Sequence, residues 1–255
     1  MNEVDEVEDQ RYRAPALDKG LDILELLAGT ADGLSQTEIA RALDRTPSEI
    51  YRVLDRLVRR DYLRRSSGDR YELNLKLFEL AHQSPPIHRL IRLATPVLRR
   101  FALRTEQAVH LVVEDRNILV VIAQFDGPGY WNVSIRVGSR INLVNTGSGH
   151  VFLAYSTTEE RILMLEAQGL AEPTKLPTGL EARLNNVREH GFENMPSAQT
   201  VGVFNLSVPI FGPMGSVLAV ITCPYTQRLD KLDAPNMPAV LKQLQQAGKE
   251  ISHRW

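Results

Sequence analysis

The 255-residue sequence has little of what several protein classes require. It contains one cysteine, Cys223, so no disulfide framework can form, which suits a reducing compartment. Its six histidines are scattered, and none stands at a spacing typical of zinc ligands. Apolar runs such as Val217–Cys223 are far too short to span a membrane, and the acidic start is unlike a signal peptide. We therefore expect a cytoplasmic protein with no metal, no other cofactor and no membrane partner.

A general excess of basic residues is also absent, since the formal net charge is −1. The charges are unevenly distributed, however. Residues 2–9 hold five acids and no base, which predicts a disordered acidic tail over residues 1–14. Residues 41–70 hold nine arginines and no lysine against five acids, a local excess of four positive charges. Because the arginine fork binds phosphates and guanine edges with two hydrogen bonds, this segment is a candidate nucleic-acid surface. A solvated helix face is the alternative.

The same region carries the start signals of three helices. Leucines repeat at helical spacing over residues 17–27, and that helix is expected to end near Gly29. Two Ser/Thr-x-x-Glu capping boxes follow, at residues 35–38 and 46–49, and each predicts the start of a short helix. Pro47 stands at the first position of the third helix, where a missing N–H costs nothing.

A hairpin completes this domain. Residues 62–65 and 70–73 read as two short strands around a Ser-Ser-Gly-Asp turn. The order helix, helix, tight turn, helix and hairpin is that of a winged helix-turn-helix, which we assign to residues 15–82. Base-edge candidates lie at the start of the third helix, and phosphate candidates follow on it and on the wing. The predicted DNA-binding residues are Arg45, Ser48, Tyr51, Arg52, Arg56, Arg64, Arg65 and Arg70.

The remainder of the chain has a different character. Ser84-Pro85-Pro86 marks a break, and an apolar helical stretch over residues 83–106 is predicted to link two domains, with Pro96 kinking it or starting a second segment. Residues 107–255 are predicted to form an α+β domain, a central antiparallel sheet with flanking helices. Its β-like runs are residues 108–114, 118–125, 131–137, 203–211 and 216–222, and its helices begin near residues 146, 158, 179 and 238.

The sequence resembles the IclR family of bacterial transcriptional regulators over nearly all of residues 15–251. The similar stretches occur in order in both domains, which is much harder to obtain by chance than a match in either one. They are Leu17–Leu24, Ile39–Leu43, Ser48–Leu54, Tyr62-Leu63, Leu93–Pro96, Thr105-Glu106, Val137–Arg140, Thr146–Gly149, Gly202-Val203 and Ser207–Pro209. The resemblance implies a GAF-like effector-binding domain and a homodimer or homotetramer whose paired DNA-binding domains read a pseudo-palindromic operator in double-stranded DNA.

The resemblance also implies a small-molecule effector pocket between the sheet and the Thr146–Gly149 turn. Family members that bind small oxoacids tend to carry an acid and a cysteine where this chain has Met195 and Asn205, so a larger or aromatic carboxylate is the expected effector. The N–H groups of Gly147 and Ser148 would hold its anionic end at a helix N-terminus. The expected effector-binding residues are Trp131, Gly147, Ser148, Met195, Val203, Asn205 and Ser207. For Trp131, ordinary burial in a core is the alternative.

Two other functions have to be weighed. An enzyme is disfavoured because Ser148 is not in a Gly-x-Ser-x-Gly elbow, the glycines at 147 and 149 do not complete a dinucleotide loop, and Cys223 lies in an apolar strand. A winged helix that only contacts proteins, beside a ligand-sensing domain, is disfavoured by the arginine excess. The sequence leaves open the effector, the operator, dimer or tetramer, and whether the protein represses or activates.

Overall fold

A computed structural model describes residues 14–170, 172–231 and 233–255. The predicted acidic tail, apart from its last residue, lies outside the described residues. The chain divides into two compact units, residues 1–85 and 86–255, and each is described by itself. Within the described ranges, no helix is both long enough and apolar enough to cross a membrane.

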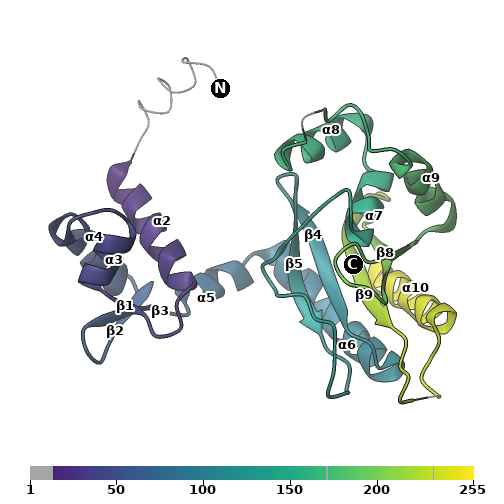
Figure 1. Cartoon of the computed structure of the whole chain (residues 1–255), viewed down its shortest axis with the longest axis horizontal. Coiled ribbons are helices and arrows are strands. Elements are labelled where there is room, and N and C mark those ends of the chain that lie inside the picture. The colour runs from purple at the N-terminus through teal and green to yellow at the C-terminus, as the bar shows by residue number, and fades with distance from the viewer. Residues whose placement is uncertain (1–13, 171, 232) are drawn as a thin grey trace. The chain divides into compact units, whose positions relative to one another are not determined.

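In its described residues, from 14 onward, the N-terminal unit contains helices α2 to α5 and a small antiparallel sheet with the strand order β1-β3-β2. The elements are α2 (Pro15–Ala28), β1 (Leu34–Ser35), α3 (Gln36–Ala42), α4 (Pro47–Arg59), β2 (Leu63–Ser66), β3 (Arg70–Leu73) and α5 (Lys76–His82). One apolar core joins the first three helices to the hairpin through fully buried Ile23, Ile39, Ile50 and Leu54. This is the predicted winged helix-turn-helix, with β2 and β3 as the wing (Figure 1).

Both predicted capping boxes are present. The Glu38 N–H donates to Ser35 Oγ at 3.3 Å, and the Ser35 N–H donates back to Glu38 Oε2 at 2.7 Å. At the start of α4, the N–H and the hydroxyl of Thr46 both donate to Glu49 Oε2 at 2.8 Å. These backbone hydrogen bonds hold the pKa of Glu38 and of Glu49 below the usual value, and they satisfy N–H groups that a helix start otherwise leaves unpaired.

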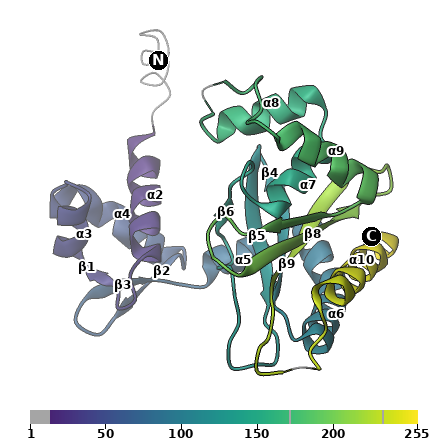
Figure 2. The same cartoon turned by 45° about the vertical axis from the view of Figure 1, so that its right-hand side comes forward.

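The C-terminal unit is a six-stranded sheet covered on both faces by helices. Every strand pair is antiparallel, and the order is β6-β5-β4-β9-β8-β7. One apolar cluster packs α6 and α10 on one face, and a second packs α7, α8 and α9 on the other (Figures 1 and 2). The elements are α6 (Pro85–Thr105), β4 (Val109–Asp115), β5 (Ile118–Phe125), β6 (Arg140–Ile141), α7 (Gly147–Tyr155), α8 (Thr158–Ala167), α9 (Leu180–His190), β7 (Glu193–Pro196), β8 (Val203–Phe211), β9 (Val217–Thr226) and α10 (Met237–Arg254). The predicted antiparallel α+β fold is confirmed.

Helix α6 differs from the predicted linker. Its apolar side, which includes Leu90 and Leu98, is buried in the same cluster as Val240 and Leu244 of α10. The helix therefore belongs to the C-terminal unit, which begins at Pro86. Pro96 lies inside this single helix, so it does not start a second segment, which was one of the two predicted alternatives.

The predicted strand over residues 131–137 does not form. Side chains take up the hydrogen bonds that a neighbouring strand would have made: the Ile135 N–H donates to Gln124 Oε1 at 3.4 Å, and Asn132 Oδ1 accepts from the Gly127 N–H at 2.9 Å. On this edge of the sheet, the ladder pairing with β5 is limited to the two residues of β6. The alternation of valine and isoleucine reflects a segment that covers the sheet edge with one side inward, rather than a strand in the ladder.

Candidate nucleic-acid interface and ligand cavity

Helix α4 presents an exposed polar face opposite its buried side. Ile50 and Leu54 fix the helix against the core, which turns Ser48, Tyr51 and Arg52 outward. Among the described residues, the side chains of Arg45, Ser48, Tyr51, Arg52 and Arg56 have no hydrogen bond or ion pair. A surface whose donors are unpaired in the free protein can give them to a nucleic acid without first breaking internal bonds.

The wing arginines are arranged differently, because each has an internal partner. Arg64 pairs with Glu72 at 2.7 Å, and Arg65 pairs with Asp69 at 3.3 Å. Arg70 is half-buried: its Nη2 donates to the Gly33 carbonyl at 2.9 Å and its Nη1 lies 3.2 Å from Glu38. Arg70 therefore ties the wing to the loop before α3, a structural role that the arginine count alone did not distinguish from phosphate binding.

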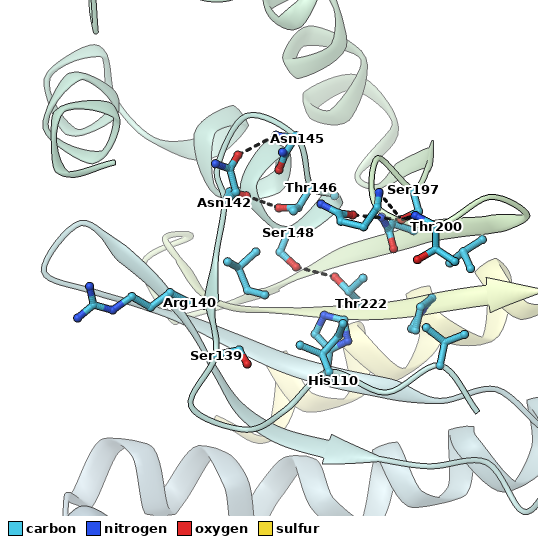
Figure 3. A pocket seen from close by; sticks show the side chains of 18 residues that line it. His110, Ser139, Arg140, Asn142, Asn145, Thr146, Ser148, Ser197, Thr200 and Thr222 are labelled. Atoms are coloured by element: carbon cyan, nitrogen blue, oxygen red, sulfur yellow. Dashed lines mark hydrogen bonds between the residues drawn. The ribbon is translucent and has the colours of Figure 1, made fainter. Parts of the chain in front are cut away.

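A cavity of about 340 Å³ lies between the sheet of the C-terminal unit and the start of α7 (Figure 3). Its walls come from β4, β8 and β9, from the irregular segment around Val133 and Ile135, and from the loop before α7. Arg140 is the one ordinarily charged side chain on the lining, and no acid lines the cavity. The polar lining residues are His110, Ser139, Arg140, Asn142, Asn145, Thr146, Ser148, Ser197, Gln199, Thr200, Asn205 and Thr222.

Most of the expected effector residues meet at or beside this cavity. Gly147, Ser148, Val203 and Asn205 line it. Ser207 lies directly behind the lining, fully buried. The other two residues lie elsewhere.

Met195 is buried on β7 beside Asn205 and does not line the cavity. Trp131 is half-exposed and lines a neighbouring hollow of about 450 Å³. The two hollows share Val133, Thr200 and Val203 as walls.

Close packing, rather than an unusual backbone angle, requires glycine in the Thr146–Gly149 turn. Neither Gly147 nor Gly149 has a positive φ. A Cβ at Gly147 would instead collide with Ser207 Oγ, and one at Gly149 would collide with the Leu143 carbonyl. Thr146 caps the helix through a 3.1 Å hydrogen bond from the Gly149 N–H. The N–H groups of Gly147 and Ser148, at the first two positions of the helix, have no intrahelical partner, and both residues line the cavity.

At the cavity wall, three buried hydroxyl groups form a short hydrogen-bonded row. Thr222 Oγ1 lies 2.8 Å from Ser148 Oγ and 2.7 Å from Ser207 Oγ. These hydrogen bonds join α7 to β9 and β8, and they hold the start of the helix against the sheet.

A second buried group fixes the other side of α7. His150 Nδ1 lies 2.7 Å from Glu193 Oε2, and its Nε2 lies 3.0 Å from the Val144 carbonyl. Glu193 Oε1 also accepts from Arg183 Nη1 at 2.9 Å. Both nitrogens of the buried His150 ring and both oxygens of Glu193 therefore have partners inside the protein, which fixes this side of α7 to β7 and α9.

Both parts of the chain match the same group of known proteins. Residues 16–67 match the IclR helix-turn-helix domain, and residues 86–253 match the family described as bacterial transcriptional regulator IclR C-terminal. The chain belongs to the IclR family. Members of this family are transcriptional regulators that combine a DNA-binding helix-turn-helix with a C-terminal ligand-binding domain, and this chain has both parts in that order.

Two characterised IclR-family relatives illustrate the similarity. The chain is 29% identical to the HTH-type transcriptional regulator KdgR of Escherichia coli over 194 residues, 74% of each protein. It is 28% identical to the HTH-type transcriptional repressor AllR of the same organism over 216 residues, 82% of this chain and 79% of the relative.

Solved structures show the same fold. The chain is 22% identical to an IclR homolog from Microbacterium hydrocarbonoxydans complexed with 4-hydroxybenzoate, with a TM-score of 0.76 over 93% of this chain and 98% of that one. The IclR of Thermotoga maritima gives a TM-score of 0.75 at 22% identity, over 95% of this chain and 99% of that one.

In this IclR-family chain, the residues considered for catalysis have other partners. The Ser148 hydroxyl bonds to Thr222, whereas the His150 ring bonds to Glu193 and to a backbone carbonyl, so the two do not form a nucleophile and base. Cys223 is fully buried, and burial raises the pKa of its thiol, which disfavours the reactive thiolate. Across the described ranges, no cluster of three or more histidine, cysteine or acidic side chains is arranged to hold a metal ion.

Among the described cavity residues that the sequence did not single out, one is buried and lacks a hydrogen-bond partner. His110 of β4 is 4% exposed and lines the cavity, yet its Nδ1 has no partner within the described part of the chain. Burial lowers the pKa of its imidazole to about 4, so the ring is neutral near pH 7. The only signal in the sequence is one polar residue within the apolar run Val109–Val113, a pattern that a histidine packed in a core would also give.

Proposed function

We propose that this protein is a sequence-specific DNA-binding regulator whose operator affinity is modulated by a larger or aromatic carboxylate bound in the cavity beneath α7. The observation that carries the proposal is the combination of an unpaired polar face on α4 with an acid-free cavity at a helix start. Both lie where the family resemblance leads us to expect the contacts with DNA and with a ligand.

On the DNA side, the roles follow from position and pairing. A recognition helix contacts base edges with its N-terminal residues, so Arg45, Ser48 and Arg52 are assigned to bases, with Tyr51 beside them. Arg56 and the wing residues Arg64 and Arg65 are assigned to phosphates, because phosphate contacts position a protein without reading sequence. Arg70 is also assigned to a phosphate, although part of its guanidinium group is already bonded to the Gly33 carbonyl and to Glu38.

On the ligand side, charge and shape favour a carboxylate with an apolar body. The unpaired N–H groups of Gly147 and Ser148 and the positive end of the α7 dipole favour an anion there. Val133, Ile135 and Val203 supply apolar walls. The adjoining hollow beneath Trp131 would accommodate a larger ligand body, and 4-hydroxybenzoate, the ligand of the Microbacterium hydrocarbonoxydans homolog, is the first compound to test.

An apolar groove on the N-terminal unit supports the proposal of a homodimer, or of a homotetramer built from dimers. Leu17 and Leu21 are 61% and 47% exposed, and with Leu77 they border a groove of about 530 Å³ between α2, α4 and α5. A second copy would cover these leucines and pair two recognition helices over a pseudo-palindromic operator. Light scattering should give at least a dimer at micromolar concentration, and Leu21→Glu should shift it toward monomer. A monomeric wild-type protein would contradict the assignment.

The central experiment measures DNA binding with and without ligand. Fluorescence anisotropy with DNA from upstream of the protein's own locus should give specific, salt-dependent binding, and 4-hydroxybenzoate should change the affinity by about 1–3 kcal/mol of coupling. Asn205 lines the cavity and its amide has no hydrogen-bond partner among the described residues, so Asn205→Ala should weaken ligand binding and leave ligand-free DNA binding unchanged. Equal affinity for upstream and random DNA would instead support a winged helix that contacts proteins alone.

A further inference from the structure

A row of polar side chains crosses the sheet of the C-terminal unit on the face beneath α7. Strand register places His110 of β4 opposite Thr222 of β9, Thr222 opposite Ser207 of β8, and Ser207 opposite Glu193 of β7. Cross-strand partners project from the same face of a sheet, so these four side chains stand side by side. All four are at least 96% buried.

Three members of this row have their hydrogen bonds satisfied inside the protein. Thr222 bonds to two hydroxyl groups, Ser207 bonds to Thr222, and Glu193 accepts from His150 and Arg183. His110 is the exception, since its side chain has no hydrogen bond within the described residues and its Nδ1 is a buried polar atom without a partner. Buried polar groups in proteins are paired in the large majority of cases, so an unpaired one requires an explanation.

The position of His110 supplies that explanation. It lies on the cavity lining, and Figure 3 shows its ring beside Thr222, beneath the Ser148–Thr222 hydrogen bond. The cavity volume of about 340 Å³ falls within the range of small-molecule sites, about 300–1,000 Å³. A ligand in this cavity would therefore touch the α7 start with one part and His110 with another.

The charge state of the His110 imidazole indicates which part of the ligand it would contact. Burial holds the pKa of His110 at about 4, and no acid lines the cavity to favour its charged form. A neutral imidazole offers one donor and one acceptor, which matches a hydroxyl group and, through its donor alone, a carbonyl oxygen. The carboxylate is better placed at the unpaired N–H groups of Gly147 and Ser148.

We propose that His110 is a specificity-determining residue of the effector site, and that it hydrogen-bonds an uncharged hydroxyl or keto oxygen of a carboxylate effector. This inference rests on the proposed function, because it assumes that the cavity is the effector site. It adds that the effector carries a second oxygen function, and that His110 distinguishes such a compound from the plain acid.

The first test needs no ligand and compares two neighbours in the row. His110→Leu removes a polar group that has no partner, so it should raise the melting temperature of the ligand-free protein by about 2–4 °C. Thr222→Val removes a group with two partners and strands the hydroxyls of Ser148 and Ser207, so it should lower the melting temperature. A clear fall for His110→Leu would mean that the imidazole has an internal structural role, and would overturn the proposal.

The second test uses calorimetry with carboxylates that differ by one oxygen: 4-hydroxybenzoate against benzoate, lactate against propionate, and pyruvate against propionate. Wild-type protein should prefer the oxygenated member of at least one pair by about tenfold, the value of one well-placed hydrogen bond. His110→Leu should abolish the preference while the affinity for the plain acid stays unchanged, and His110→Gln should restore part of it. A preference that survives in His110→Leu, or no preference or binding in the wild-type protein, would overturn the proposal.

Measurements of DNA binding distinguish a failure of the His110 proposal from a failure of the proposed function. Ligand-free His110→Leu should bind upstream DNA as the wild-type protein does, because the substitution lies in the C-terminal unit. Specific DNA binding that responds to a carboxylate independently of His110 would support the proposed function and reject the role of His110. Absence of specific DNA binding in the wild-type protein would reject the proposed function, whatever the calorimetry shows.

Discussion

The two units position their candidate functional groups in opposite ways. In the N-terminal unit, the side chains assigned to bases stand on the outside of one short segment, residues 45–52, with their polar groups in water. In the C-terminal unit, the cavity brings together residues as far apart in the sequence as His110 and Pro224, and several of them are buried. One site is an exposed helix face, whereas the other exists only after the sheet and α7 have packed together.

This difference has energetic consequences. An exposed arginine without a partner costs the folded protein little, because water solvates it, so its removal should affect DNA binding and leave stability unchanged. A buried polar group affects stability whether or not a ligand is present, because its desolvation must be compensated inside the protein. Substitutions in the two sites should therefore separate into those that change binding alone and those that change folding.

The largest effect is expected in the C-terminal unit at Glu193. Glu193→Ala would leave the buried His150 ring and Arg183 without their common partner, and the loss of one member of a buried pair typically costs about 3–5 kcal/mol. Urea unfolding at pH 7 would measure it. The control is Glu172→Ala, which removes the exposed partner of the exposed Lys175 and should cost less than about 1 kcal/mol. Equal losses would show that burial of the pair is unimportant.

The next largest effect is the pH dependence that His110 contributes. Its pKa is about 4 in the folded protein, against an ordinary value of 6.5, so between these values the unfolded chain binds the proton more readily. The contribution is fully present above pH 6.5 and is lost as the pH falls to about 4, a change of about 3 kcal/mol. Measuring the free energy of unfolding against pH for the wild-type protein and for His110→Leu isolates the contribution of His110 from that of the other titrating groups. Parallel stability curves for the two proteins would show that His110 titrates normally.

The N-terminal unit was the easier of the two to predict from sequence, for a physical reason. Capping boxes, such as Ser35 with Glu38, and apolar stripes are local patterns whose members lie within a few residues of each other. In both units, the main helices and strands could be located along the chain from such local patterns. The two roles of the arginines, Arg52 unpaired and Arg70 bonded to the Gly33 carbonyl, depend on tertiary contacts and were not separable in advance.

The cavity was only partly predictable, and its residues came from family resemblance rather than from pattern. Gly147, Ser148, Val203 and Asn205 were expected there on that ground and do line it. His110 was missed because strand register, not sequence spacing, places it beside Thr222. The alternation over residues 131–137 predicted a strand. Such periodicity indicates which side chains face inward, but it does not determine the hydrogen-bond partners of the backbone.

A smaller effect is expected for DNA binding alone. Arg52→Ala should weaken binding to the operator by about 1–3 kcal/mol and reduce the preference for it over random DNA, if Arg52 contacts a base. Arg65→Ala should weaken binding to all sequences alike and lower the salt slope by about one, as expected for a phosphate contact. Neither should change the urea unfolding midpoint by a measurable amount. An unchanged ratio of specific to nonspecific affinity in Arg52→Ala would reject the base-reading role.

The smallest effect tests whether the exposed site depends on the scaffold beneath it. The Ser35 hydroxyl accepts the Glu38 N–H at the start of α3, and Glu38 in turn pairs with Arg70 of the wing. Ser35→Ala should therefore cost about 1 kcal/mol of stability in the N-terminal unit, the usual value of a helix cap, whereas Ser67→Ala in the exposed wing turn should be nearly neutral. Because Ser35 is assigned no contact with DNA, operator affinity and salt slope should stay unchanged where both proteins are fully folded. A loss of affinity without a loss of stability would mean that the start of α3 itself touches the DNA backbone, and the nucleic-acid interface would then extend beyond α4 and the wing.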